Sequence, residues 1–406
     1  MTRRVIPIVS GSQPVAPTAR SPASGLSALP PLSLYVHVPW CIRKCPYCDF
    51  NSHQAPEQLP EKAYLEALRT DLEQALPNIW GRQVHTIFIG GGTPSLLSEG
   101  AIDQMLGLFR AHLNLWPDAE ITLEANPSAT EASRLQSYAQ SGVNRISLGI
   151  QSLNNEHLTA LGRVHDAQQA REAIESAMNA VARVNLDLMY GLPGQTVMQC
   201  EQDLRALVAF GCEHLSIYQL TLEPQTVFAK YPPVLPDEIQ IEQMEQVIEQ
   251  TVAAAGWQRY EVSAYAKAGA RCRHNMNYWT FGDYLGIGPG AHSKLSFPDR
   301  IIRQARTRNP LQWMQACGQM DGSHISEQRQ LSPEELPFEF FLNALRLKEG
   351  VELDLLNRHT GLTLSDVLEP FDRAQSRGLL DVGHDRVKAT ALGWRHLNEL
   401  QAIFLD

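Results

Sequence analysis

The sequence lacks the features that mark membrane, secreted and nucleic-acid-binding proteins. No apolar run approaches the ~20 residues that a membrane-spanning helix needs. The net charge of -10 leaves no basic surplus for general nucleic-acid binding. The seven cysteines form no disulfide-like framework, and no secretory leader is recognisable. We therefore expect reduced thiols in the cytoplasm, no membrane insertion and no nucleic-acid partner.

Residues 1–32 lack acidic residues altogether and are rich in Pro, Ser and Ala, with arginines at Arg3, Arg4 and Arg20. A mitochondrial transit peptide has a similar composition. The prolines, however, interrupt any continuous amphipathic helix in this stretch. We expect a disordered N-terminal tail of the kind that bacterial proteins carry.

A fourth cysteine is missing from the most informative motif, Cys41-Ile42-Arg43-Lys44-Cys45-Pro46-Tyr47-Cys48. Three thiolates in a CxxxCxxC array suit a four-iron, four-sulfur (4Fe-4S) cluster that keeps one iron open. A structural zinc site would need a fourth ligand, which His37 or His53 could supply. The motif follows an apolar run at 34–38, so an open iron at a strand end indicates chemistry at that point.

Six short β-rich runs alternate with amphipathic helical segments. The runs cover residues 34–38, 86–89, 121–124, 145–150, 184–189 and 215–220. Such alternation predicts a parallel sheet with right-handed crossovers. Six units are too few for a complete eight-stranded barrel, so we predict an α/β fold with a partial, TIM-like (β/α)6 barrel. An open doubly wound sheet also fits the pattern, and both folds place function at the carboxyl ends of the strands.

The pattern changes after about residue 225. A helix is predicted over 236–255, a strand over 259–264, and mostly helix from 332 onward. A hairpin at 379–382 and 386–389 and a last helix at 392–404 then suggest a winged-helix-like tail. The predicted organisation is a tail at 1–32, a core at 33–265, a connecting segment at 266–330 and a mainly helical C-terminal domain at 331–406.

The run from Tyr35 through the three cysteines resembles the radical S-adenosylmethionine (SAM) superfamily. In that superfamily the open iron binds SAM, which an electron can cleave to a radical. The resemblance is closer to the oxygen-independent coproporphyrinogen III oxidase family, and within it to a heme chaperone branch. It extends from about residue 34 to the C-terminus and implies a HemN-type C-terminal domain.

The resemblance also implies a set of cofactor contacts, carried over position by position. The metal ligands are Cys41, Cys45 and Cys48. The expected SAM contacts cluster at strand ends, and Gln219 and His292 match less closely. Carboxylates suit ribose hydroxyls and an ammonium group, and a guanidinium suits a carboxylate. The expected SAM contacts are Tyr35, Tyr47, Gly91, Gly92, Thr93, Glu124, Gln151, Arg163 and Asp187.

A second motif, His274-Asn275-Met276-Asn277-Tyr278-Trp279, matches an HNxxYW signature of the heme chaperone branch. The resemblance links it to heme and implies heme contacts at His274, Asn275, Tyr278 and Trp279. Chemically, the histidine could bind iron and the aromatic rings could stack on a porphyrin. Cys272 is a rival iron ligand, and an aromatic patch between domains is the structural alternative.

The sequence departs from the oxidases at Phe50, where that family carries a further cysteine. This departure favours a heme chaperone that binds a 4Fe-4S cluster, SAM and heme. The implied partners are heme and a heme-acceptor protein, for example a respiratory membrane enzyme. The alternative is a radical SAM enzyme such as oxygen-independent coproporphyrinogen III oxidase, so whether the chain is an enzyme stays open at this point.

Overall fold

The computed structural model describes Leu26 and residues 28–405. Residues 1–25, 27 and 406 lie outside the described residues, and most of the tail predicted at 1–32 falls among them, although its last residue, Leu32, begins strand β1 (Leu32–Val38). The prediction for that tail is therefore untested.

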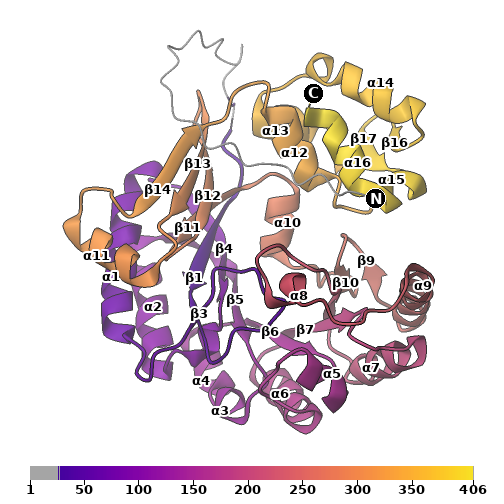
Figure 1. Cartoon of the computed structure of the whole chain (residues 1–406). Coiled ribbons are helices and arrows are strands. Elements are labelled where there is room, and N and C mark those ends of the chain that lie inside the picture. Colours follow the sequence, from indigo (N-terminus) through magenta and orange to yellow (C-terminus); the bar gives the residue numbers. More distant parts are fainter. Residues whose placement is uncertain (1–25, 27, 406) are drawn as a thin grey trace.

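A twelve-stranded sheet organises most of the chain (Figure 1). Its strands run in the order β14-β13-β12-β11-β1-β4-β5-β6-β7-β8-β10-β9. The stretch from β11 to β8 is parallel throughout. The six predicted strands are all present, so the predicted α/β core is confirmed. They are β1 (Leu32–Val38), β4 (Gln83–Gly91), β5 (Asn114–Ala125), β6 (Arg145–Gln151), β7 (Arg183–Tyr190) and β8 (His214–Gln219).

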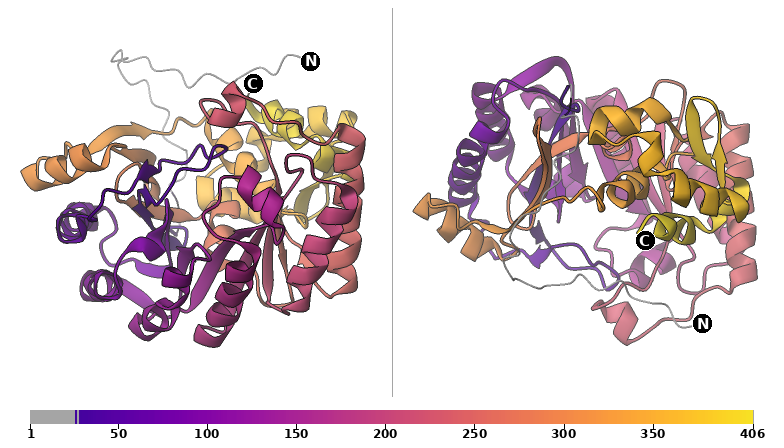
Figure 2. Two further views of the ribbon diagram at one scale, coloured as in Figure 1. Left: turned by 60° about the horizontal axis from the view of Figure 1, so that its bottom comes forward. Right: turned by 90° about the horizontal axis from the view of Figure 1, so that it is seen from above.

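Helices follow the strands and cover the outer face of the sheet, as Figure 2 shows. Their apolar sides pack on the strands and form one continuous core. Asp166, Thr196 and Asp237 begin three of them with capping boxes, which satisfy backbone donors of the first turn. The helices are α1 (Glu61–Ala75), α2 (Glu99–His112), α3 (Ala129–Ala132), α4 (Leu135–Ser141), α5 (Asn155–Ala160), α6 (Ala167–Ala180), α7 (Val197–Ala209) and α9 (Glu238–Ala254). The short helix α8 (Val227–Lys230) lies instead beside the cysteine motif, where the N–H of Phe228 donates to the Pro46 carbonyl over 3.0 Å.

A seventh parallel strand, β11 (Asp283–Ile287), pairs with β1 and was not predicted. It is followed by an antiparallel extension of the same sheet, made of β12 (His292–Ser296), β13 (Ile301–Arg306) and β14 (Ile325–Gln330), with α11 (Pro310–Gln319) before the last strand. Residues 283–330 therefore extend the sheet beside β1.

The strand predicted over 259–264 is wrong in detail. The structure has two short antiparallel strands, β9 (Gln258–Arg259) and β10 (Ala264–Ala266), because the chain reverses between them. The helix predicted over 392–404 is likewise broken at His396 into α15 (Ala391–Arg395) and α16 (Leu397–Ala402).

The C-terminal part has its own apolar core, in which Phe341 packs against Phe340, Phe371 and Phe404. The predicted hairpin is present as β16 (Leu380–Val382) and β17 (Arg386–Ala389). The other elements are α12 (Leu336–Ala344), β15 (Val351–Glu352), α13 (Leu353–Thr360) and α14 (Leu368–Ser376).

Helix α10 (Arg273–Trp279) lies between the sheet and the C-terminal helices and contacts β1, β4, β11 and α12 (Figure 1). It carries the HNxxYW motif, so the motif is placed at the junction between the two cores. Among the described residues, no helix combines the length and the apolar character that crossing a bilayer would require.

Candidate functional site

The three motif cysteines line one cavity at the carboxyl ends of the parallel strands. Cys41 ends the short strand β2 (Trp40–Cys41), which pairs with β3 (His53–Gln54) across the loop. Inside the loop, the backbone N–H of Cys48 donates to the carbonyl of Cys45 over 3.2 Å. The Lys44 ammonium donates to the carbonyls of Phe50 (3.2 Å) and Ser52 (3.3 Å). These bonds hold the loop so that all three thiols face the same space.

Three cysteine thiols are a donor set that suits a 4Fe-4S cluster with one open iron. Within the described residues, no three His, Cys, Asp or Glu side chains lie together as ligands of one metal ion. A cluster needs no such convergence, because each thiolate binds a different iron. Of the two histidines that the zinc alternative could recruit, His37 is engaged on both nitrogens, with the Tyr35 hydroxyl (3.0 Å) and the Asn51 carbonyl (2.9 Å). His53 Nε2 is buried and has no hydrogen-bond partner among the described residues.

The glycine run at the end of β4 brings its backbone into contact with the segment that leads into the cysteine loop. A Cβ on Gly92 would lie 2.5 Å from the Trp40 carbonyl oxygen, and one on Gly91 would lie 2.6 Å from the His37 ring. Gly91 also has a φ of +114°, which side-chain-bearing residues rarely adopt. The Gly92 N–H donates to the Val38 carbonyl over 2.7 Å. Glycine is therefore required here for close approach, in a loop with no phosphate-binding lysine.

Eight of the nine expected SAM contacts line the cavity of the cysteines, which we call the cysteine cavity. The exception is Tyr35, which lines a neighbouring second cavity. The cysteine cavity also contains polar residues that the sequence did not single out, of which Asn126 stood beside a predicted strand end. They are Ser52, Asn126, Ser147 and Tyr218.

Arg163 connects the cysteines to the strand ends. Its guanidinium donates to Cys45 Sγ (3.6 Å), to Asn126 Oδ1 (2.6 Å) and to the Gly149 carbonyl (2.8 Å). The Arg163 Nε is buried and has no hydrogen-bond partner among the described residues. A buried donor without a partner is costly, so the site retains unused capacity to bind an anionic group such as a carboxylate.

Two carboxyl groups, Glu124 and Asp187, share the inner wall of the cavity. Burial, followed by the repulsion of Asp187, raises the pKa of Glu124 to about 7. Burial raises the pKa of Asp187 to about 6. The Gly91 N–H donates to Glu124 Oε2 over 3.1 Å, and Asn185 donates to Asp187 Oδ1 over 2.7 Å. A cationic ligand such as an ammonium group would stabilise the ionised form of these buried carboxyl groups.

Substituting Glu124 by glutamine should stabilise the ligand-free protein at alkaline pH. The pKa of Glu124 is near 4.5 in the unfolded chain and about 7 in the folded protein. The folded protein therefore loses stability as the pH rises from about 4.5 through about 7, because burial disfavours the ionised carboxylate. Glu124→Gln removes that cost, so we expect a melting temperature roughly 2–4 °C higher at pH 8 and little change at pH 5. Thermal melts of the ligand-free protein at both pH values measure this. The exposed Glu57→Gln is the control, and an equal shift at both pH values would contradict the prediction.

Backbone strain also concentrates at this site. Gln151, at the end of β6, has a φ of +68°, and the pairing of β6 with β7 shifts register just before it. Its side chain accepts a hydrogen bond of 2.8 Å from the Tyr218 hydroxyl. Left-handed backbone at a non-glycine residue costs about 1–3 kcal/mol and tends to occur at functional positions.

The HNxxYW motif on α10 contributes to the second cavity through Tyr278 alone. His274 is buried, and both ring nitrogens are engaged, Nδ1 with Thr86 Oγ1 (2.8 Å) and Nε2 with the Tyr278 hydroxyl (3.1 Å). Burial lowers the pKa of His274 to about 3. Asn275 and Trp279 line neither cavity. The predicted heme role of His274, Asn275 and Trp279 is therefore not explained by the cavities.

The rival ligand Cys272 is also enclosed. Its thiol is fully buried and donates to Glu120 Oε1 over 3.5 Å, and burial raises its pKa to about 11. The same carboxylate accepts the backbone N–H groups of Arg273 (3.2 Å) and His274 (3.1 Å). Glu120 thus satisfies the first turn of α10 and fixes the motif helix to strand β5.

Comparisons with known proteins agree over most of the chain. Residues 35–207 match the Radical SAM superfamily model, and residues 331–396 match the HemN C-terminal domain model. The chain is 48% identical to the heme chaperone HemW of Escherichia coli (strain K12), covering 93% of this chain and 99% of that protein. It is 44% identical to the heme chaperone HemW of Haemophilus influenzae, covering 93% and 98%.

A solved structure resembles the whole fold. The coproporphyrinogen III oxidase HemN from Escherichia coli, a radical SAM enzyme, superposes with a TM-score of 0.79 over 95% of this chain and 91% of that one. At 24% sequence identity this similarity concerns the fold alone.

Proposed function

The chain belongs to the radical SAM superfamily and, within it, to the family of the heme chaperone HemW, and from this membership we propose that it binds heme and transfers it to an acceptor protein. The observation that carries the proposal is the identity of 44–48% over nearly the full length of both relatives. Two separate family matches support the proposal, because a Radical SAM core and a HemN C-terminal domain occur together in this chain.

The residues of the cysteine cavity support a 4Fe-4S cluster and SAM as cofactors. We propose Cys41, Cys45 and Cys48 as the iron ligands. When bound, such a cluster supplies an open iron for the amino-acid end of SAM and a source of single electrons. Arg163 then has an unused donor for the carboxylate of SAM, while Glu124 and Asp187 provide negative charge for its ammonium and acceptors for its ribose hydroxyls.

Phe50 favours the function of a heme chaperone over that of a coproporphyrinogen III oxidase. The oxidases carry a cysteine at this position, whereas Phe50 here is 65% exposed and lines the cysteine cavity. A phenyl ring provides no additional thiol and instead offers an apolar surface to a flat ligand. We further propose that the protein works in the cytoplasm and passes heme to a separate acceptor, for example a respiratory membrane enzyme.

Heme titration of the full-length protein tests the proposal. We expect heme absorbance that saturates at one equivalent, followed by transfer of that heme to an apo-acceptor such as apomyoglobin. Absence of saturable binding would overturn the proposal. Anaerobic incubation with coproporphyrinogen III, a reductant and SAM addresses the alternative activity. Formation of protoporphyrinogen IX would identify the protein as an oxidase instead.

A further inference from the structure

A second cavity, of about 460 Å³, adjoins the cysteine cavity. Phe50, Gly91 and Glu124 line both, so the two cavities are neighbours. This volume is within the range of cavities that hold organic cofactors. The other lining residues come from β1, α10, β11, the cysteine loop and the segment around β12 and β13, and are Tyr35, His37, Asn51, Tyr278, Tyr284, Gly290, His292 and Arg308.

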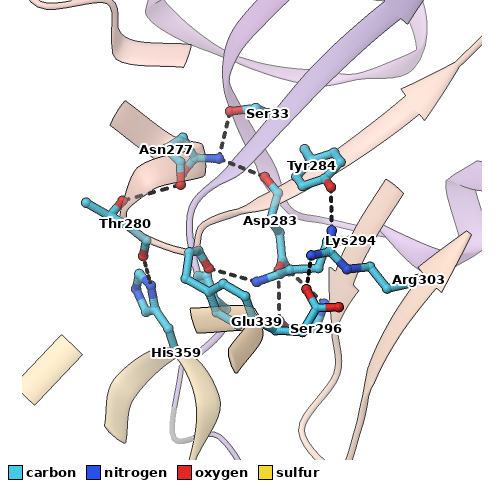
Figure 3. Close-up of polar contacts among 12 residues, drawn as sticks. Ser33, Asn277, Thr280, Asp283, Tyr284, Lys294, Ser296, Arg303, Glu339 and His359 are labelled. Atoms are coloured by element: carbon cyan, nitrogen blue, oxygen red, sulfur yellow. Dashed lines mark hydrogen bonds and ion pairs between the residues drawn. The ribbon is translucent and has the colours of Figure 1, made fainter. Parts of the chain in front are cut away.

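The walls of this cavity are aromatic and are held in place by hydrogen bonds. Tyr278 and Tyr284 meet edge to face with their ring centres 4.5 Å apart. The Arg303 guanidinium donates to the Tyr284 hydroxyl and pairs with Glu339 of α12, as Figure 3 shows. The Tyr278 hydroxyl is held by His274. The motif histidine thus positions a wall of the cavity rather than facing into it.

Phe50 differs from these fixed rings because its side chain is 65% exposed. The loop beneath it is nevertheless anchored, since Asn51 Nδ2 donates to the carbonyls of Pro289 (2.9 Å) and Arg308 (3.0 Å). An exposed phenyl ring on an anchored loop, at the border of two cavities, is suited to cover the face of a large planar ligand.

Of the two histidines that line the cavity, His292 alone offers a ring to a ligand. Both nitrogens of His37 are engaged, as described above. Within the described part of the chain, the exposed His292 ring makes no hydrogen bond or ion pair. Desolvation lowers the pKa of His292, and Arg303 and Arg308 lower it further against the opposing effect of Glu327. The imidazole is therefore neutral near pH 7, the form that binds iron.

The second cavity also contains a guanidinium group, that of Arg308. Arg308 lines the same cavity, is exposed, and forms no ion pair with any residue in the described range. A guanidinium at a cavity mouth pairs favourably with carboxylates. An apolar face, a free imidazole and a free guanidinium together match a flat, iron-bearing macrocycle with carboxylate arms.

We propose that the second cavity is the heme site, with His292 as the protein ligand of the iron, Phe50 against the ring face and Arg308 paired with a propionate. This inference rests on the proposed heme-binding function and assigns it a place and a ligand. In the HNxxYW motif, Tyr278 then contacts heme and His274 acts as a positioning residue.

Heme titration of His292→Ala, monitored by absorbance, tests the ligand. We expect at least tenfold weaker binding and a changed position of the main heme band. His292→Gly with added imidazole should restore the wild-type spectrum, because the free base can occupy the vacated space. The matched control is His384→Ala, which removes an exposed histidine of the C-terminal domain. Wild-type affinity and spectrum in His292→Ala would overturn the inference. Loss of heme binding in His274→Ala, with binding retained in His292→Ala, would also overturn it.

Two further substitutions test whether heme binds in the second cavity. Phe50→Ala should weaken heme binding by about tenfold and Phe50→Trp should retain it. Arg308→Gln should weaken it by about threefold to fivefold. Trp80→Ala, which removes another exposed aromatic ring, is the control. If neither Phe50→Ala nor Arg308→Gln weakens binding, the second cavity is not the heme site. Failure of the wild-type protein to bind heme would instead refute the proposed function.

Discussion

Substituting Cys45 by serine is expected to abolish the iron–sulfur cluster of the reconstituted protein. Cys45 is one of three thiols that face the cysteine cavity, and Arg163 Nη1 lies 3.6 Å from its sulfur. Changes to groups around metal ligands alone cost about 10–100-fold in metal affinity. Loss of a ligand itself should therefore cost at least about 100-fold. Iron analysis and the absorbance of the anaerobically reconstituted protein measure this, and SAM binding should be lost with the cluster.

Cys212→Ser is the matched control for this experiment. Cys212 is buried away from the cavity, and its thiol donates to the His214 carbonyl over 3.4 Å, a bond that serine can also make. The control should therefore keep wild-type iron content. Four irons and an unchanged spectrum in Cys45→Ser would show that the cluster is bound elsewhere.

Substituting Asp283 by alanine is expected to produce the largest loss of folding stability. Asp283 is fully buried at the start of β11, where Arg82 (2.7 Å) and Lys294 (3.0 Å) pair with its carboxylate (Figure 3 shows Lys294). The N–H and hydroxyl of Ser296 also donate to it, each over 2.8 Å. Removing one partner of a buried pair leaves a charge uncompensated and costs about 3–5 kcal/mol.

Asp283→Ala would leave both Arg82 and Lys294 without their carboxylate, and Lys294 is the more deeply buried of the two. It is 1% exposed, and burial already lowers its pKa to about 8 even with Asp283 in place. The double variant Asp283→Ala/Lys294→Met removes that buried charge, so it should recover most of the lost stability. Chemical denaturation at pH 7 measures both variants, with the exposed Asp299→Ala as a control that should barely change stability. Equal losses in the single and double variants would contradict the electrostatic explanation.

The core of the fold follows from the sequence because its signals are local. Apolar runs alternating with amphipathic segments predict the six parallel strands and their crossovers without knowledge of contacts. Strand β11 gives no such signal, since Gly286 interrupts it and glycine-rich chain follows. It forms because β1 has an unpaired edge and because Asp283, Arg82 and Lys294 join there across more than 200 residues of chain.

The candidate site is predictable to a similar extent. The cysteine spacing, the glycine run and the strand-end residues indicate one cavity, and eight expected SAM contacts line it with the cysteines. The position of Tyr35 in the second cavity is not visible in the sequence, because the other walls of that cavity come from α10, β11 and the segment around β12 and β13, which are distant along the chain. Asn126 also escapes a motif search, since its role depends on Arg163 reaching it from another crossover.

The sequence by itself therefore determines the family, the three thiols and the parallel core, because these depend on spacing and periodicity along the chain. Tertiary structure alone decides which histidine is free to bind a ligand. His274 has the more suggestive motif, yet its ring is buried and bonded on both nitrogens, whereas His292 lies in an ordinary strand and is exposed to a cavity. Burial and hydrogen-bond partners arise only when distant segments pack together, and these determine whether an imidazole is available.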